Sequence, residues 1–231
     1  MKKNFMRILA LACVFILSGN LLTAQNIGIG VRAGANFSNI VSKDANDNVW
    51  RNNINPGFHV GVTYDLPLAG VVYLQPAALF STKGYSSTSN SATTDSKYSE
   101  TPYYLEVPVN LLLKPEIGPD RLLVGFGPYV AYGLGGKWKD KMTGSGSNTE
   151  TGKLEFINDW KDESDKNDVE AYGKKVDFGL NVLGGYEFSN SLSIQLNGQY
   201  GLANLRPNVD GKKPENSFKN IGFGISLGYK F

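Results

Sequence analysis

The fold is decided by residues 220–231, which read NIGFGISLGYKF. Apolar side chains stand at every second position from Ile221 to Phe231, with Gly, Ser and Lys between them. Such alternation is typical of a β-strand whose two faces meet different surroundings. This stretch therefore predicts a strand with one apolar face and one small, polar face.

The same alternation recurs along the chain, and no segment after residue 24 shows a convincing helical period. We therefore predict an all-β protein with eight strands. They cover residues 27–38, 58–66, 72–81, 103–113, 122–134, 176–186, 192–200 and 220–231.

The links between these strands alternate in length. The second, fourth and sixth strands are followed by short links, and the other links are long and hydrophilic. This pattern predicts an eight-stranded antiparallel transmembrane up-and-down β-barrel with short periplasmic turns and long extracellular loops. The short links are 67–70, 115–120 and 189–191, and the long ones are 39–55, 84–101, 136–174 and 203–217.

A soluble sandwich or a lipocalin-like barrel is the alternative fold. Its outer face would carry the Lys and Glu of a solvated surface, whereas here the second face is mostly Gly, Ser, Asn, Gln and Ala. A mean hydropathy of -0.23 argues against a helical membrane protein but not against a barrel. Aromatic residues placed where the apolar face would meet the two membrane interfaces favour the membrane barrel. They are Phe58, Phe80, Tyr103, Tyr132, Tyr186, Tyr200, Tyr229 and Phe231.

Residues 1–24 have the form of a secretory signal peptide, with a basic start and an apolar run at Ile8–Leu17. We expect cleavage between Ala24 and Gln25, leaving a barrel domain at 25–231. The apolar run is shorter than the ~20 residues that a spanning helix needs. This expectation places the protein in the outer membrane of a Gram-negative bacterium.

The charge and cysteine content narrow the possible partners. Removing the three basic signal residues from 23 leaves 20, against 21 acidic residues, so the formal charge falls from +2 to -1. A nearly neutral chain predicts no nucleic-acid partner. The single cysteine, Cys13, lies in the signal and makes a lipoprotein a weaker alternative. Disulfides, thiolate metal sites and cysteine nucleophiles are thereby excluded from the barrel.

Catalytic chemistry has few candidates. His59 is the one histidine, and spacing alone assigns it no serine or acidic partner. We therefore expect no catalytic residues, no metal site and no cofactor, and a lumen role for His59.

Five ionisable residues are predicted to point into the lumen. A charge inside a narrow barrel is costly unless it is paired, so we expect salt bridges across the lumen, with Arg32 bound to Glu106 or a nearby acid. The resulting polar plug would close the barrel; a conducting path is the alternative. The predicted cluster is Arg32, His59, Lys83, Glu106 and Asp177.

Two other groups of residues give local expectations. The link 136–174 could be partly ordered and extend the strands beyond the membrane. Its aromatic residues Trp138, Phe156 and Trp160 could contact a protein or polysaccharide partner; a mobile solvated loop is the alternative. Inside three strands, prolines cannot donate to the ladder and could mark bulges. These are Pro76, Pro108 and Pro128.

Several motifs resemble the PorT-like outer-membrane β-barrel family, often labelled "porin family". They are YLQP at 73–76, STKG at 81–84, YLEVP at 104–108, GFGPY at 125–129, DFGLN at 177–181 and QYGL at 199–202. Ala77 departs from the acidic residue usual after the Gln-Pro pair. The end ISLGYKF resembles the C-terminal signal read by the barrel-assembly machinery, with Tyr229 and Phe231 as its aromatic residues. The resemblance implies an eight-stranded outer-membrane barrel, with some members linked to secretion, but no shared activity.

The sequence thus favours a monomeric, non-enzymatic outer-membrane barrel in contact with membrane lipid. Its role would be structural, surface-contact or secretion-associated. A small passive pore is the first alternative, followed by a barrel enzyme acting on lipid or peptide, and then a soluble periplasmic binding barrel.

Overall fold

A computed structural model describes residues 28–231, apart from 45–47, 91–93, 145–146 and 161–169. The predicted signal peptide, with its cleavage between Ala24 and Gln25, lies outside the described residues. In the part of the chain that is described, no helix is long and apolar enough to cross a membrane.

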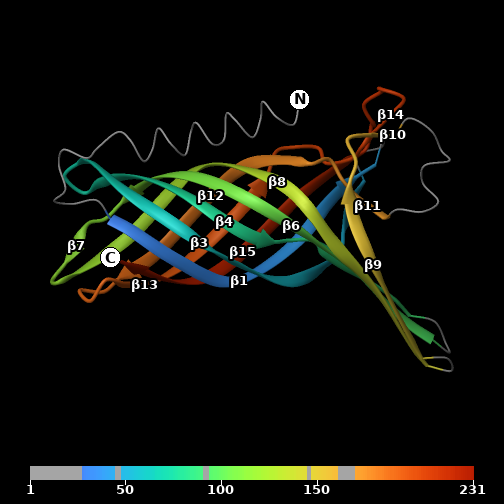
Figure 1. The fold of residues 1–231 in the computed structure, drawn as a ribbon, viewed down its shortest axis with the longest axis horizontal. Coiled ribbons are helices and arrows are strands. Elements are labelled where there is room, and N and C mark those ends of the chain that lie inside the picture. The colour runs from blue at the N-terminus through green and yellow to red at the C-terminus, as the bar shows by residue number, and fades with distance from the viewer. Residues whose placement is uncertain (1–27, 45–47, 91–93, 145–146, 161–169) are drawn as a thin grey trace.

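Eight long strands form a closed ring (Figure 1). Each pairs antiparallel with the next ring strand along the chain, and the last pairs with the first, so the predicted eight-stranded up-and-down barrel is confirmed. The ring strands are β1 (Gly28–Lys43), β3 (Asn53–Ala69), β4 (Val72–Thr82), β6 (Thr94–Leu113), β8 (Asp120–Gly144), β12 (Val176–Glu187), β13 (Leu192–Gly201) and β15 (Ser217–Lys230).

The long links contain more strand than the sequence predicts. Their residues alternate between two polar faces, so hydrophobic periodicity does not reveal them. Much of the links 84–101 and 136–174 is strand that extends beyond the ring. The further strands are β2 (Val49–Arg51), β5 (Tyr85–Asn90), β9 (Asn148–Phe156), β10 (Asp159–Trp160), β11 (Glu170–Gly173) and β14 (Asn208–Val209), and the short link 115–120 contains β7 (Glu116–Ile117).

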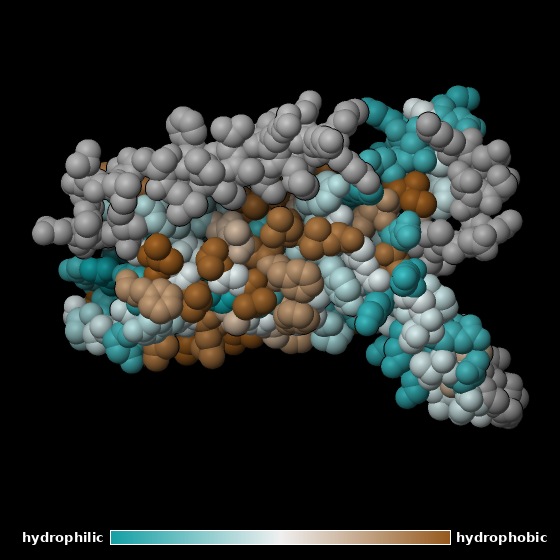
Figure 2. All heavy atoms as spheres, viewed as in Figure 1, coloured by the Kyte–Doolittle hydropathy of each residue, from teal (hydrophilic) through white to brown (hydrophobic). Residues whose placement is uncertain are grey.

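The two faces of the wall follow the predicted alternation. Large apolar side chains such as Phe126 and Leu196 are exposed on the outside. Figure 2 shows hydrophobic residues gathered over the barrel wall. Near the extracellular end, Phe58, Phe80 and Tyr103 are neighbours, with ring centroids 5.8 and 5.9 Å apart. These contacts match a lipid-facing band with an aromatic border.

The three strand prolines that could have marked bulges do not produce them. Pairing beside Pro76, Pro108 and Pro128 lacks some bridges, but the register is the same on either side, because a missing N–H removes a bond without adding a residue. A bulge instead lies between Tyr103 and Tyr104, where β8 carries one extra residue, Leu134, between the partners of these tyrosines.

Beyond this bulge, four strands continue past the ring as a polar extension, which we call the blade. It consists of β9, residues 136–144 of β8, residues 94–101 of β6, and β5, in that order. The blade leaves the barrel at an angle and ends well away from it (Figure 1). Because β6 and β8 run without interruption from wall to blade, the barrel holds the extension in place.

Candidate functional site

The upper part of the lumen holds the charge cluster Lys83, Glu106 and Asp177, which we call the upper cluster. Lys83 follows β4, and its Nζ lies 2.8 Å from Glu106 Oε2 and 3.8 Å from Asp177 Oδ2. All three side chains are at most 5% exposed. The ammonium also lies 4.4 Å from the ring centroid of Tyr129. One cation thus holds together two carboxylates from different strands.

Neighbouring polar groups fix both carboxylates. Asn220 Nδ2 donates to Asp177 Oδ2 at 2.8 Å, and the Tyr129 hydroxyl donates to the same oxygen at 3.2 Å. Gln199 donates to Glu106 Oε1. These bonds satisfy buried acceptors that would otherwise be costly.

The expected ion pair of Arg32 with Glu106 is not formed. Arg32 Nη1 instead donates to Gln195 Oε1 at 3.3 Å, and Arg32 has no ion pair with any described residue. Arg32 and Glu106 line the same cavity, but Lys83 occupies the ion-pairing position on Glu106. Lumen polarity was therefore predicted correctly, and this pairing was not.

His59 has two side-chain partners in mid-lumen. Its Nδ1 lies 2.7 Å from Asn36 Oδ1, and its Nε2 lies 2.9 Å from Ser226 Oγ. Since an amide oxygen only accepts, Nδ1 donates and Nε2 accepts from the serine. Sequence spacing misses this serine–histidine–asparagine arrangement, because it joins three strands. His59 and Ser226 are both buried, and the adjoining cavity of ≈10 Å³ has no room for a substrate.

A second charge cluster lies at the periplasmic end and was missed by the sequence-based prediction. Lys114 Nζ bonds to Asp65 Oδ2 and lies 2.7 Å from Glu187 Oε2. Lys230 Nζ lies 2.9 Å from the other oxygen of Glu187. Each residue stands on the polar face at the periplasmic end of its strand, and that position is the sequence signal that could have revealed the cluster.

An aromatic cap closes the extracellular end of the lumen. Phe156 of β9 packs edge-on against Tyr104 and Tyr172, with centroids 5.2 and 5.8 Å away, and Leu205 lies fully buried in the same cluster. The expectation that Phe156 could contact a partner is thus wrong, because its ring is buried in the cap. Burial of this segment's apolar side chains is favourable and anchors the link to the barrel.

The other two proposed contact residues lie outside the cap's centre. Trp138 stacks on Tyr98 with centroids 6.3 Å apart, and the missing side chain of Gly152 leaves room for its indole. Trp160 lies on β10, which pairs with β14. Both are partly exposed.

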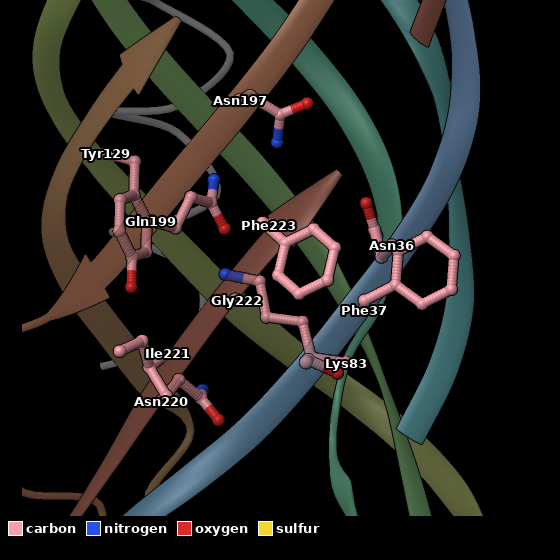
Figure 3. Close-up of a pocket in the computed structure, with 11 residues that line it drawn as sticks. Asn36, Phe37, Lys83, Tyr129, Asn197, Gln199, Asn220, Ile221, Gly222 and Phe223 are labelled. Atoms are coloured by element: carbon pink, nitrogen blue, oxygen red, sulfur yellow. The ribbon is translucent and has the colours of Figure 1, made fainter. Parts of the chain in front are cut away.

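The lumen between the clusters contains little free space. Three cavities among the described residues have volumes of ≈20, 10 and 20 Å³, each enough for about one water. Figure 3 shows Lys83, Tyr129, Gln199 and Asn220 around the first of them. A larger, open pocket of ≈440 Å³ lies at the periplasmic mouth beside Arg121 and Glu187. Among described residues, no group of three or more His, Cys, Asp and Glu side chains could hold a metal.

The match to a known protein family agrees with this architecture. Residues 23–206 match the family described as outer membrane protein beta-barrel domain. Ail, the attachment invasion locus protein of Yersinia pestis, is 14% identical, with 88% of this chain and 98% of that chain covered and a TM-score of 0.38.

Two other solved structures are similar at a comparable level. Neisserial surface protein A is 11% identical over 90% of this chain and 100% of that chain, with a TM-score of 0.39. The outer membrane enzyme PagL is 11% identical over 84% and 98%, with a TM-score of 0.36. No curated protein matches the sequence significantly.

Proposed function

The chain belongs to the outer membrane protein β-barrel domain family, and we propose that it is a non-enzymatic barrel with a closed lumen and a surface-contact role. The filled lumen carries this proposal. Ion pairs occupy its two charged levels, aromatic rings cap it, and its cavities are water-sized. A barrel of this kind is a rigid support for what it displays outside the membrane.

Conductance tests the closed lumen against the alternative of a small passive pore. The full chain, refolded and inserted into planar bilayers, should give no single-channel steps. Reproducible steps at single-protein dilution would contradict the proposal and favour the pore.

The non-enzymatic part rests on the surroundings of His59. Its two bonds hold it inside a lumen that no lipid tail or peptide can enter, and Ser226 is equally buried. Replacing His59 with Ala should leave the lipid profile of the host membrane unchanged. An altered profile that also appears in the Ser226→Ala variant would indicate a barrel enzyme.

The surface-contact role rests on the blade, which the long ring strands hold away from the barrel. Crosslinking in intact cells, with photoreactive groups placed in the link from Trp138 to Trp160, should capture a protein or polysaccharide partner. Equal, low-yield crosslinking to all abundant surface components would argue for a purely structural role.

Several finer features belong to the same proposal. We expect export by a signal peptide cleaved between Ala24 and Gln25, PorT-like membership, and assembly as a monomer, since a closed ring has no free strand edge in the wall. A secretion-associated role is the form that PorT-like membership would favour.

The C-terminal signal should act through Tyr229 and Phe231; Phe231 also donates its N–H to Ile29 O at 2.9 Å across the β1–β15 seam. Peptide mapping of the mature N-terminus tests the cleavage.

A further inference from the structure

The blade has one strongly basic face, which we call the lysine face. Neighbouring strands bring five lysines together there, because Lys141 is the cross-strand partner of Lys97 and Lys137 is the partner of Lys153. Lys139 stands between them on β8. All five side chains are exposed, and none forms an ion pair with a described residue.

The opposite face of the blade holds acids and aromatic residues. Asp140 accepts a hydrogen bond from Ser96, the Tyr98 hydroxyl donates to Glu100, and Trp138 stacks on Tyr98. Charges of opposite sign are therefore separated between the two faces instead of being paired across strands. The lysine face itself carries two acids among the described residues, Asp95 at its tip and Glu155 at its base.

Like charges in direct cross-strand positions destabilise a sheet. Acidic residues placed between the lysines on this face of β8 would have removed the repulsion. The acids on the opposite face show that this part of the chain accommodates acidic residues. An anionic ligand that covers the face would remove it equally well. The unbalanced charge is the first observation that points to such a ligand.

The bulge at Leu134 determines which way the lysines point. In the wall, the odd-numbered residues of β8 face the lumen; beyond the bulge, they pair with the odd-numbered, lipid-facing residues of β6. Lys137, Lys139 and Lys141 thereby join the lipid-facing side. Without the extra residue, the same lysines would stand on the lumen side.

The lysine face also begins close to the membrane. Lys137 pairs with Thr101, two residues beyond Tyr103 of the aromatic border, which is about 7 Å along the strand. The polar layer outside the hydrocarbon is itself about 5–7 Å deep on each side. The first lysines therefore lie at headgroup level, and the others follow outward along the blade.

From this placement we propose that the lysine face binds the phosphate groups of anionic glycolipids in the outer leaflet around the barrel. Ammonium groups bind phosphate as compact point charges, and threonine hydroxyls between the lysines, such as those of Thr149 and Thr151, can donate to phosphate oxygens. Continuity with the lipid-facing wall favours a lipid over a soluble polyanion. The inference rests on the proposed outer-membrane orientation, with the blade outside the cell.

Amine labelling of the intact protein tests this proposal. The full chain is placed in phosphatidylcholine nanodiscs that contain either phosphorylated lipid A or an equal amount of its dephosphorylated form. A water-soluble acetylating reagent is added, and labelling rates at individual lysines are measured by mass spectrometry. Lys212 and Lys213, which are exposed beside β14, are the control lysines in the same molecule.

Labelling of the lysine face should slow about fivefold with phosphorylated lipid, return to the control rate in high salt, and leave the two control lysines unchanged. Equal rates in the two discs would overturn the proposal. The proposal would also be overturned if heparin added to neutral discs slowed labelling of the lysine face while the lipid phosphates had no effect on it. That result would indicate a soluble polysaccharide as the ligand. Heat-modifiable migration of the same samples shows whether the barrel has folded and inserted. A barrel that fails to insert is thereby distinguished from an inserted barrel whose lysines bind no lipid phosphate.

Discussion

Removal of Lys83 provides the sharpest test of how the lumen is held together. Lys83 lies within 4 Å of Glu106 and Asp177, and all three side chains are buried. Methionine is similar in length but has no charge, so Lys83→Met leaves two buried carboxylates without their shared cation, and only Glu106 lines a cavity together with Arg32. Breaking a buried pair from one side costs about 3–5 kcal/mol, and we expect that loss in the free energy of unfolding.

Unfolding in urea, with the barrel inserted in lipid vesicles and followed by tryptophan fluorescence, measures the loss. Lys153→Met on the exposed blade is the matched control and should change stability by less than about 0.5 kcal/mol. Adding Asp177→Asn to Lys83→Met restores charge balance, because Glu106 then faces Arg32 alone, and the amide oxygen can still accept from Asn220. This double variant should recover more than half of the loss.

Two results would refute this reasoning. Lys83→Met could match the surface control, which would mean that water or membrane ions neutralise the carboxylates. Alternatively, the losses from Lys83→Met and Asp177→Asn could simply add, which would mean that the two groups do not interact.

Three further predictions concern the wall and its turns. Gly61→Ala should destabilise the barrel by about 3 kcal/mol or prevent folding, because the new Cβ would lie 2.0 Å from a backbone oxygen. In the control Gly184→Ala, the nearest atom to the new Cβ is 4.0 Å away, so this variant should fold normally. A heat-modifiability assay compares the two variants. Leu196→Arg should cost about 2–4 kcal/mol in vesicle unfolding if this exposed residue faces mid-bilayer lipid, and a cost near zero would place it outside the membrane. In the periplasmic turn, a hydrogen bond from the Tyr186 hydroxyl lowers the pKa of Asp120. This bond therefore stabilises the fold at pH values above the ordinary carboxyl pKa, and the stabilisation is lost as the pH falls through the lowered pKa. Tyr186→Phe should raise the Asp120 pKa in an NMR titration, and an unchanged pKa would contradict the assignment.

The wall could be predicted from the sequence because its two faces meet different media. Lipid on one side selects apolar side chains, and a crowded lumen on the other selects small and polar ones, so alternation exposes each strand. Both faces of the blade lie outside the hydrocarbon layer, and its strands pair polar residues with polar residues. Periodicity of hydrophobicity carries no information there, and 94–101 reads as a loop.

Lumen residues were predictable as a class but not as partners. Arg32, Lys83 and Glu106 could be assigned to the inward face from parity alone. Which cation reaches Glu106 depends on the stagger between strands and on side-chain reach, neither of which appears in the spacing. The burial of Phe156 was equally hidden, because it requires β9 to fold back over the barrel mouth.

The uninterrupted run of β6 and β8 into the blade leaves the length of the blade free to vary during evolution. Removing two residues from each of the four blade strands would shorten the display and keep every remaining residue on its own side. Removing one residue from the base of each would exchange the basic and the acidic surfaces and leave the barrel wall unchanged. Among natural variants, insertions and deletions at the base of the blade strands should therefore occur in even steps where the charge of the surface matters, and in odd steps where a new surface antigen is favoured.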